Sequence, residues 1–217
     1  MLIGDLHVNS PQFAVACEEA GADAVLLHLN QDAQGGARFG GWEIEEQSIK
    51  DTFSVLKIPA GISIGDNRLM LTSDWEAVVG VGFSFVNMLA HQLPTFVWED
   101  PRINKVVSIG PGYLFEQVRS IADFPNTSAI VASLTPSQLI GLPLTLLDVT
   151  TLGLICKLSQ KPVLMPTQRL IRPDDVGLMK NQGCKGVIAS STIYGESPDG
   201  CREQISLFRK KIQTSLT

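Results

Sequence analysis

The chain has 217 residues, of which 44% are hydrophobic and 18% are charged, and its formal net charge is −5. These values are typical of a globular α/β protein with a full hydrophobic core. Because the chain has no basic stripe and only 6% aromatic residues, we do not expect a nucleic-acid partner. No apolar run reaches the roughly 18 residues that a membrane span needs, so no span is expected either.

The N-terminus and the cysteines indicate a cytoplasmic protein. Residues 1–8 (MLIGDLHV) lack the basic segment of a signal peptide and enter a predicted strand directly. The cysteines show no CxxC spacing, and we expect them to be reduced thiols, mostly packed in helices. They are Cys17, Cys156, Cys184 and Cys201.

Strands and helices alternate through the first half of the chain. Apolar runs predict strands over residues 2–7, 24–29, 59–65 and 83–89. Capping and stop signals predict helices over residues 10–20, 42–56 and 73–81, the last with a capping box at Ser73–Glu76. This alternation is typical of a parallel sheet.

The second half is expected to complete a closed barrel. Residues 94–126 are predicted to be a helical layer broken at residues 110–112, with a strand over residues 105–109 as the alternative. Further strands are predicted over residues 129–134, 144–149, 162–166 and 186–189. Counting them gives eight strands, or nine with the alternative. The sequence therefore predicts an α/β fold, a single-domain (β/α)8 TIM barrel over residues 1–217.

The closing segment, residues 161–195, locates a predicted anion site. Pro173 suits the first position of a helix that ends near Gly183, and a strand and small hydroxyl residues follow. In phosphate-binding barrels the loops after strands 7 and 8 cradle a phosphate. The residues predicted to bind the anion are Arg169, Ser190, Ser191 and Thr192. The alternative for Arg169 is a surface ion pair with Asp174 or Asp175.

Polar residues stand at the predicted C-terminal ends of the strands, where a TIM barrel builds its active site. Asp5 and His7 share one face of their strand, and His28 and Asn30 share a face of the next. All three histidines of the chain lie at such ends, so we expect one pocket. The predicted catalytic residues are Asp5, His7, His28, Asp66, Asn87, His91 and Asp148, with Asn30 lining the same pocket.

These residue types suit proton transfer, because a neutral imidazole exchanges protons near pH 7. An Asp5/His7 or a His28/Asp148 pair would move the protons. A divalent metal held by His7, His28 and Asp66 or Asp148 is the alternative, although no HxH or HExxH spacing supports it.

The Gly-rich loop over residues 30–41 has two interpretations. It is either a connector or a lid whose Arg38 contacts an anion. Its glycines do not follow the GxGxxG spacing of a dinucleotide-binding loop.

The closing segment resembles the ribulose-phosphate-binding-barrel superfamily of TIM barrels. The matching residues are, in order, Pro162–Leu164, Arg169, Pro173–Asp175, Gly183–Cys184 and Val187–Ser190. Arg169 and Leu170 stand where sugar-phosphate epimerases of this superfamily carry Arg-Ile. Gln168 and Ala189 stand where the family has two glycines. Those glycines let backbone N–H groups approach an anion closely. The resemblance implies a phosphorylated substrate at this end of the barrel.

The whole chain is also similar to the BtpA-like barrels, which are linked in photosynthetic organisms to photosystem I biogenesis. The similar segments are residues 3–7, 19–25, 60–67 and 85–87. Ser63 and Asn87 stand where aldolase- and epimerase-like barrels carry a catalytic Lys. This resemblance implies a barrel, and adds a regulatory or assembly role to the possible functions.

Three functions follow from these patterns. The leading one is an isomerase or lyase acting on a small phosphorylated or carboxylated metabolite. The second is a metal-dependent hydrolase or lyase, and the third is a non-catalytic BtpA-like barrel. A homo-oligomer is also expected, because the C-terminal helix carries Leu207 and Phe208 on a face predicted to be exposed.

Overall fold

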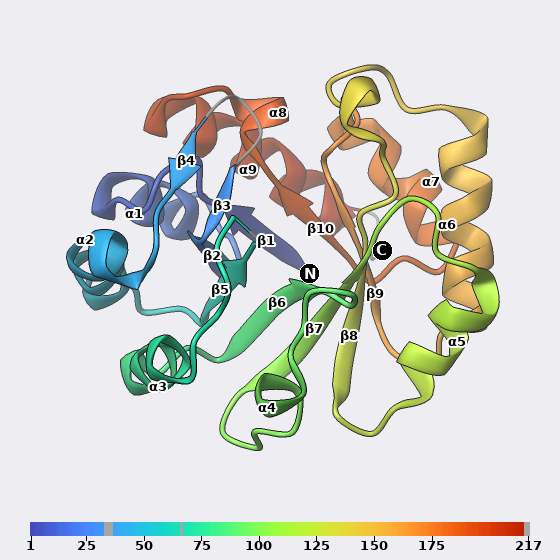
Figure 1. Cartoon of the computed structure of the whole chain (residues 1–217). Coiled ribbons are helices and arrows are strands. Elements are labelled where there is room, and N and C mark those ends of the chain that lie inside the picture. The colour runs from blue at the N-terminus through green and yellow to red at the C-terminus, as the bar shows by residue number, and fades with distance from the viewer. Residues whose placement is uncertain (33–36, 66, 215–217) are drawn as a thin grey trace.

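The computed structural model describes residues 1–32, 37–65 and 67–214, and its centre is a closed parallel barrel (Figure 1). The barrel strands are β1 (Leu2–Asp5), β2 (Ala24–Leu29), β5 (Ala60–Ile64), β6 (Phe85–Leu89), β7 (Asn104–Ile109), β8 (Thr127–Ala132), β9 (Val163–Pro166) and β10 (Gly186–Ala189). Around the barrel the hydrogen-bonded order is β1-β10-β9-β8-β7-β6-β5-β2, so neighbours along the chain are neighbours in space. The predicted (β/α)8 barrel is confirmed.

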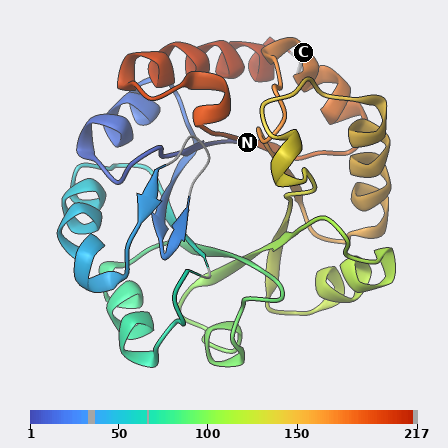
Figure 2. The same cartoon turned by 45° about the horizontal axis from the view of Figure 1, so that its top comes forward.

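Helices surround the strands, and a short hairpin lies on the inside of the helix ring (Figure 2). The helices are α1 (Pro11–Glu19), α2 (Trp42–Ser54), α3 (Thr72–Val81), α4 (Thr95–Trp98), α5 (Phe115–Asp123), α6 (Leu146–Leu158), α7 (Val176–Asn181), α8 (Ser191–Tyr194) and α9 (Pro198–Thr214). The antiparallel hairpin consists of β3 (Gln31–Asp32) and β4 (Arg38–Phe39). In the described part of the chain, none of these helices has the length and apolar character needed to cross a membrane.

Two predicted elements are wrong. Residues 105–109 belong to strand β7 and not to a helical layer, although Lys105 interrupts the apolar run. Lys105 is buried, donates from Nζ to the carbonyl of Asp100, and has its pKa lowered by burial. Residues 144–149, predicted as a strand, instead lead into α6, whose N-cap is Thr145. The total of eight strands is therefore right, but one of the eight was misplaced.

Apolar side chains fill the barrel interior below its C-terminal end. Leu26, Val106, Leu164 and Ile188 belong to one buried cluster inside the strands, and Phe85 packs against it. A Cβ at Gly61 would overlap the Phe85 ring, so any larger residue at this position would displace the ring. Because these side chains fill the interior, the barrel is open at the C-terminal ends of its strands.

The first and last helices close the outer ring. Helices α1 and α9 pack together, and the buried Sγ atoms of Cys17 and Cys201 lie 3.1 Å apart between them. Phe208 on α9 is fully buried in the hydrophobic core. It is therefore not exposed, and the prediction that it offers an oligomer surface is wrong; Leu207 is exposed at 40%.

Gly4 of β1 leaves room for this contact, and substitution should destabilise the barrel. A Cβ there would lie 2.5 Å from Sγ of Cys17, which is fixed on its other side by Cys201. We expect Gly4→Ala to lower the free energy of unfolding in urea by about 1–3 kcal/mol. The double variant with Cys17→Ala should recover part of that loss.

The matched control is Gly80→Ala in α3, where a Cβ would meet nothing within 4 Å. An exposed helical alanine there should be neutral, or stabilising by up to about 1 kcal/mol. Equal destabilisation by both substitutions would mean that the contact with Cys17 does not restrict Gly4.

Candidate active site

A cavity of about 570 Å³ opens at the C-terminal ends of the strands. Five of the predicted catalytic residues line it, namely Asp5, His7, His28, Asn87 and His91. Asp66 lies outside the described residues. The expectation that polar strand-end residues share one pocket is therefore met for these five, while their catalytic roles remain predictions.

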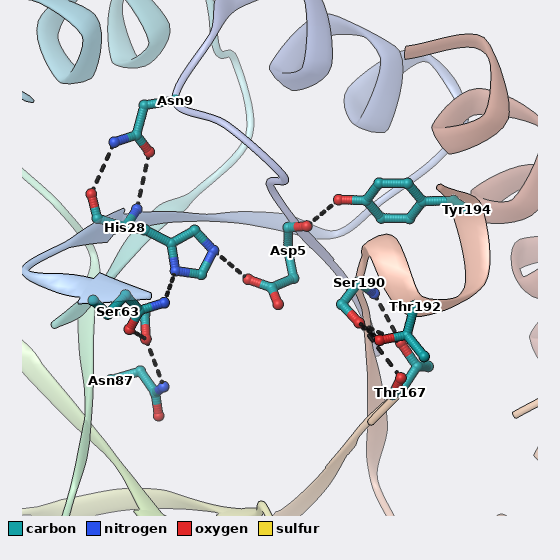
Figure 3. A network of polar contacts seen from close by, with 10 residues as sticks. Asp5, Asn9, His28, Ser63, Asn87, Thr167, Ser190, Thr192 and Tyr194 are labelled. Atoms are coloured by element: carbon teal, nitrogen blue, oxygen red, sulfur yellow. Dashed lines mark hydrogen bonds and ion pairs between the residues drawn. The ribbon is translucent and has the colours of Figure 1, made fainter. Parts of the chain in front are cut away.

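The side chains of Asp5 and His28 are in close contact at the mouth of the barrel. Their strands β1 and β2 are hydrogen-bonded neighbours, and Nε2 of His28 lies 2.6 Å from Oδ1 of Asp5. The His28 side chain is only 4% exposed, whereas that of Asp5 is 22% exposed. The other carboxylate oxygen of Asp5 points away from His28 (Figure 3). Asp5 is thus the member of the pair that a ligand in the cavity can reach.

Two neighbours hold His28 in place. The side chain of Asn9 accepts a hydrogen bond from the His28 backbone N–H at 2.9 Å and donates to its carbonyl at 2.8 Å. The ring of Phe39, on the hairpin, stacks on the imidazole with ring centroids 4.7 Å apart. The imidazole is therefore fixed from its backbone and from one ring face.

A chain of polar contacts runs from β7 across the mouth of the barrel to His28, and Figure 3 shows the part around Asn87, Ser63 and His28. Ser108 donates to Oδ1 of Asn87 at 2.7 Å, and the Asn87 amide donates to Ser63 at 3.2 Å. Ser63 then donates to Oε1 of Gln31 at 3.3 Å. The Gln31 amide nitrogen contacts Nδ1 of His28. Every link points in the same direction, towards His28.

This direction determines which nitrogen of His28 carries the hydrogen. An amide NH₂ group only donates, so Nδ1 of His28 accepts from Gln31. The hydrogen of the neutral ring is then on Nε2, the nitrogen that lies 2.6 Å from Oδ1 of Asp5. Both nitrogens of His28 are engaged, which leaves Asp5 as the free proton acceptor of the pair.

The other two histidines lie further from this pair. His7 is half-buried, and its Nδ1 has no hydrogen-bond partner in the described structure. His91 is exposed at the rim, where its Nδ1 lies 2.6 Å from the hydroxyl of Tyr113. Nδ1 of His7 is thus buried and unpaired among the described residues, while one nitrogen of His91 is already occupied.

Two buried groups behind β1 stay protonated. Tyr194 donates its hydroxyl to the carbonyl of Asp5, and burial raises its pKa well above the usual range. The hydrogen bond to Cys201, together with burial, raises the pKa of the Cys17 thiol. Both groups therefore support the strand that carries Asp5 without exchanging protons near neutral pH.

Two residues predicted for the pocket lie elsewhere. Asn30 has a positive φ of 55° and is buried, so its side chain is turned out of the alternation of β2 and away from the cavity lining. Asp148 is in the first turn of α6, where it accepts from Thr145 in a capping box. It does not line the cavity, because the segment that carries it is a helix and not a barrel strand.

The residues predicted to bind an anion are largely engaged by the protein. Arg169 is buried in an ion pair with Asp148, Nε to Oδ2 at 3.0 Å. The backbone N–H of Ser190 donates to Oγ1 of Thr167 at 2.8 Å, and its hydroxyl lies 3.0 Å from the same atom and 3.3 Å from Thr192. Of the four, Ser190 and Ser191 line the cavity.

The site also contains residues that the sequence patterns did not identify. Gln31, Ser108 and Gln168 line the cavity, and the first two belong to the hydrogen-bond chain. Ser108 follows the same period of two along its strand, and would have been found had residues 105–109 been assigned as a strand. Gln31 carries no such signal, because it belongs to a hairpin.

The described residues contain no group of three or more His, Cys, Asp or Glu side chains that could hold a metal ion. The proposed ligands His7 and His28 therefore do not meet a third such ligand there. Asp66, the other predicted ligand, is outside those residues.

Comparisons with known proteins bear out the fold. The sequence matches no family model and no curated protein. The structure is similar to tryptophan synthase of Mycobacterium tuberculosis, with a TM-score of 0.72 and 16% identity over 97% of this chain and 91% of that chain. It is also similar to phosphoribosyl anthranilate isomerase of Thermus thermophilus, with a TM-score of 0.67 and 14% identity over 99% of both chains.

A third similar structure is the thiamine phosphate pyrophosphorylase of Pyrococcus furiosus, with a TM-score of 0.67 and 15% identity over 100% of this chain and 96% of that chain. These neighbours are TIM-barrel enzymes of the ribulose-phosphate-binding superfamily that the closing segment resembles. At such identities the likeness shows the fold alone. The similarity to BtpA-like barrels stays a prediction.

The ion pair between Arg169 and Asp148 gives a stability prediction. Arg169→Ala leaves a mostly buried carboxylate without its partner, and should lower the free energy of unfolding in urea by about 3 kcal/mol. The matched control is Arg172→Ala, because Arg172 pairs with Asp175 but is 74% exposed. That variant should lose less than about 1 kcal/mol. Similar losses in both variants would contradict a structural role specific to Arg169.

Proposed function

We propose that this protein is an enzyme of the isomerase or lyase type that removes a proton from a carbon atom of a small metabolite. The contact between Asp5 and His28 at the mouth of the cavity carries this proposal. It presents a partly exposed carboxylate to a ligand, with its orientation fixed by a buried imidazole. The similarity to an isomerase of the same fold adds support at the level of the fold only.

In this proposal Asp5 is the general base. A carboxylate works as a base when it is held within reach of the substrate proton, and general base catalysis contributes about 10²–10⁴-fold. His28 is a positioning residue, because its Nε2 contacts one oxygen of Asp5 and leaves the other for the substrate.

Two further side chains have hydrogen-bonding capacity for the reaction. The Asn87 amide uses one N–H on Ser63, and its second N–H has no acceptor among the described residues. That group is suited to stabilise negative charge that develops on a substrate oxygen. His7 lines the same cavity, and its imidazole is suited to return a proton to a neighbouring atom.

The other two functions have less support. A metal-dependent hydrolase or lyase would need a ligand set, and none of sufficient size is present among the described residues. A non-catalytic BtpA-like barrel would not need titratable groups that converge on a cavity, as Asp5, His7 and His28 do.

The proposal predicts proton exchange between substrate and solvent. Purified protein is incubated in D₂O with aldoses and ketoses of three to six carbons, both free and phosphorylated, and deuterium at carbon is followed by NMR. We expect incorporation with the wild type and a loss of about 10²-fold or more in Asp5→Asn, because an amide does not accept the proton. Asp199→Asn, on the surface, is the matched control and should exchange normally. Equal exchange by Asp5→Asn and the wild type would remove Asp5 as the base.

The positioning role of His28 predicts a loss of exchange that a conservative substitution restores. In His28→Leu the rate of deuterium incorporation should fall about tenfold or more, because the Asp5 carboxylate loses the side chain that holds its orientation. His28→Gln keeps an N–H donor of similar reach and should restore much of the wild-type rate. Equal rates in His28→Leu and the wild type would contradict the role.

A further inference from the structure

We infer that the cavity takes an uncharged polyhydroxylated substrate, such as a free sugar, in preference to a sugar phosphate. This inference rests on the proposed function, because it names the substrate class of the same site. It departs from the phosphorylated or carboxylated metabolite expected from the sequence. The charges, the hydrogen-bonding groups and the closing loops of the cavity each support it.

The first observation is the charge of the cavity lining. Among the described residues that line it, Asp5 and Asp32 are acidic, and neither Lys nor Arg occurs. The stretches of chain outside the description bring no cation either, since residues 33–36 are Ala, Gln, Gly and Gly, and residue 66 is Asp. A phosphate dianion would therefore meet carboxylates without a fixed positive partner, which is electrostatically unfavourable.

The arginines that lie nearest in sequence to the cavity-lining residues are paired with carboxylates. Arg169 is buried against Asp148. Arg68 contacts Glu43 and lies 3.8 Å from Asp74. Arg38, on the hairpin, lies 3.8 Å from Asp32 of the cavity rim and is largely exposed. Arg38 is thus the arginine that an anionic ligand would have to recruit, in competition with Asp32.

The second observation is the supply of neutral hydrogen-bonding groups. The side chains of Asn67, Gln92 and Ser133 line the cavity and make no hydrogen bond in the described structure. Amides carry both donors and acceptors, and hydroxyls do the same, so they match neighbouring hydroxyl groups of a ligand. A site that hydrogen-bonds substrate hydroxyls discriminates strongly against compounds that lack them.

The third observation concerns the loops where a phosphate would sit. The backbone N–H of Ser190 already donates to Thr167. Gln168 lines the cavity, and its Oε1 accepts from the backbone N–H of Thr135 at 3.2 Å. Two backbone N–H groups of these loops, those of Ser190 and Thr135, are therefore already engaged by protein side chains.

The test compares matched pairs of ligands on the whole protein by calorimetry. The probes are D-ribulose with D-ribulose 5-phosphate, and D-fructose with D-fructose 6-phosphate. We expect the free sugar of at least one pair to bind tenfold or more tightly than its phosphate. Ser133→Ala and Gln92→Leu should each weaken that binding about threefold to tenfold. Asp32→Asn should strengthen binding of the phosphorylated sugar and so reduce the difference in affinity within the pair. Asp199→Asn, on the surface, should change the affinity of neither sugar.

The outcomes separate this inference from the proposed function. Tighter binding of the phosphorylated members, or binding of no member of either pair, overturns the inference. Deuterium exchange is measured on the same four compounds. Free-sugar binding without exchange would uphold the substrate class and count against the proton-transfer function. Exchange on the phosphorylated members alone would uphold that function and overturn the substrate class.

Discussion

Pairing between β1 and β10 closes the barrel, and the arrangement of the site depends on that closure. The register places Gly4 beside Ala189, so the strand ends that carry Asp5 and Ser190 meet although they are far apart in the chain. On the other side β1 pairs with β2, which brings Asp5 to His28. A barrel left open at this seam would expose the backbone hydrogen-bonding groups of β1 and free Asp5 from its place. The tight contact of Cys17 behind Gly4 fixes the same strand from outside.

The sequence predicts the fold well because buried parallel strands appear as short apolar runs between helix caps. The prediction fails where apolar residues are exposed or a polar residue is buried. Leu146 and Leu147 are 80% and 74% exposed at the start of α6, so an apolar run there is not a strand. Conversely, Lys105 is buried in β7 because its amine finds a backbone carbonyl. The Thr145–Asp148 capping box was the local signal that could have corrected the first error.

Part of the site follows from the alternation of side chains along strands, and part does not. The period of two correctly placed Asp5 and His28 at the mouth, since both stand in regular strands. It failed at Asn30, whose left-handed backbone breaks the alternation just where β2 gives way to the hairpin. It was also silent about Gln31, because the pairing that brings a hairpin residue onto a histidine is tertiary. The local sequence pattern thus locates the carboxylate of Asp5, but not Gln31, which fixes His28.

The hairpin is linked to Asp5 through His28, because two hairpin side chains contact the imidazole. Gln31 begins β3, and its amide supplies the donor that keeps Nδ1 of His28 unprotonated. Phe39 on β4 covers the same imidazole. If the hairpin moved away, His28 would lose both its ring cover and the contact that selects its tautomer, and Nε2–H would no longer be the only hydrogen it offers. The position of the Asp5 carboxylate therefore depends on the hairpin as well as on the barrel, because hairpin side chains fix the imidazole that contacts it.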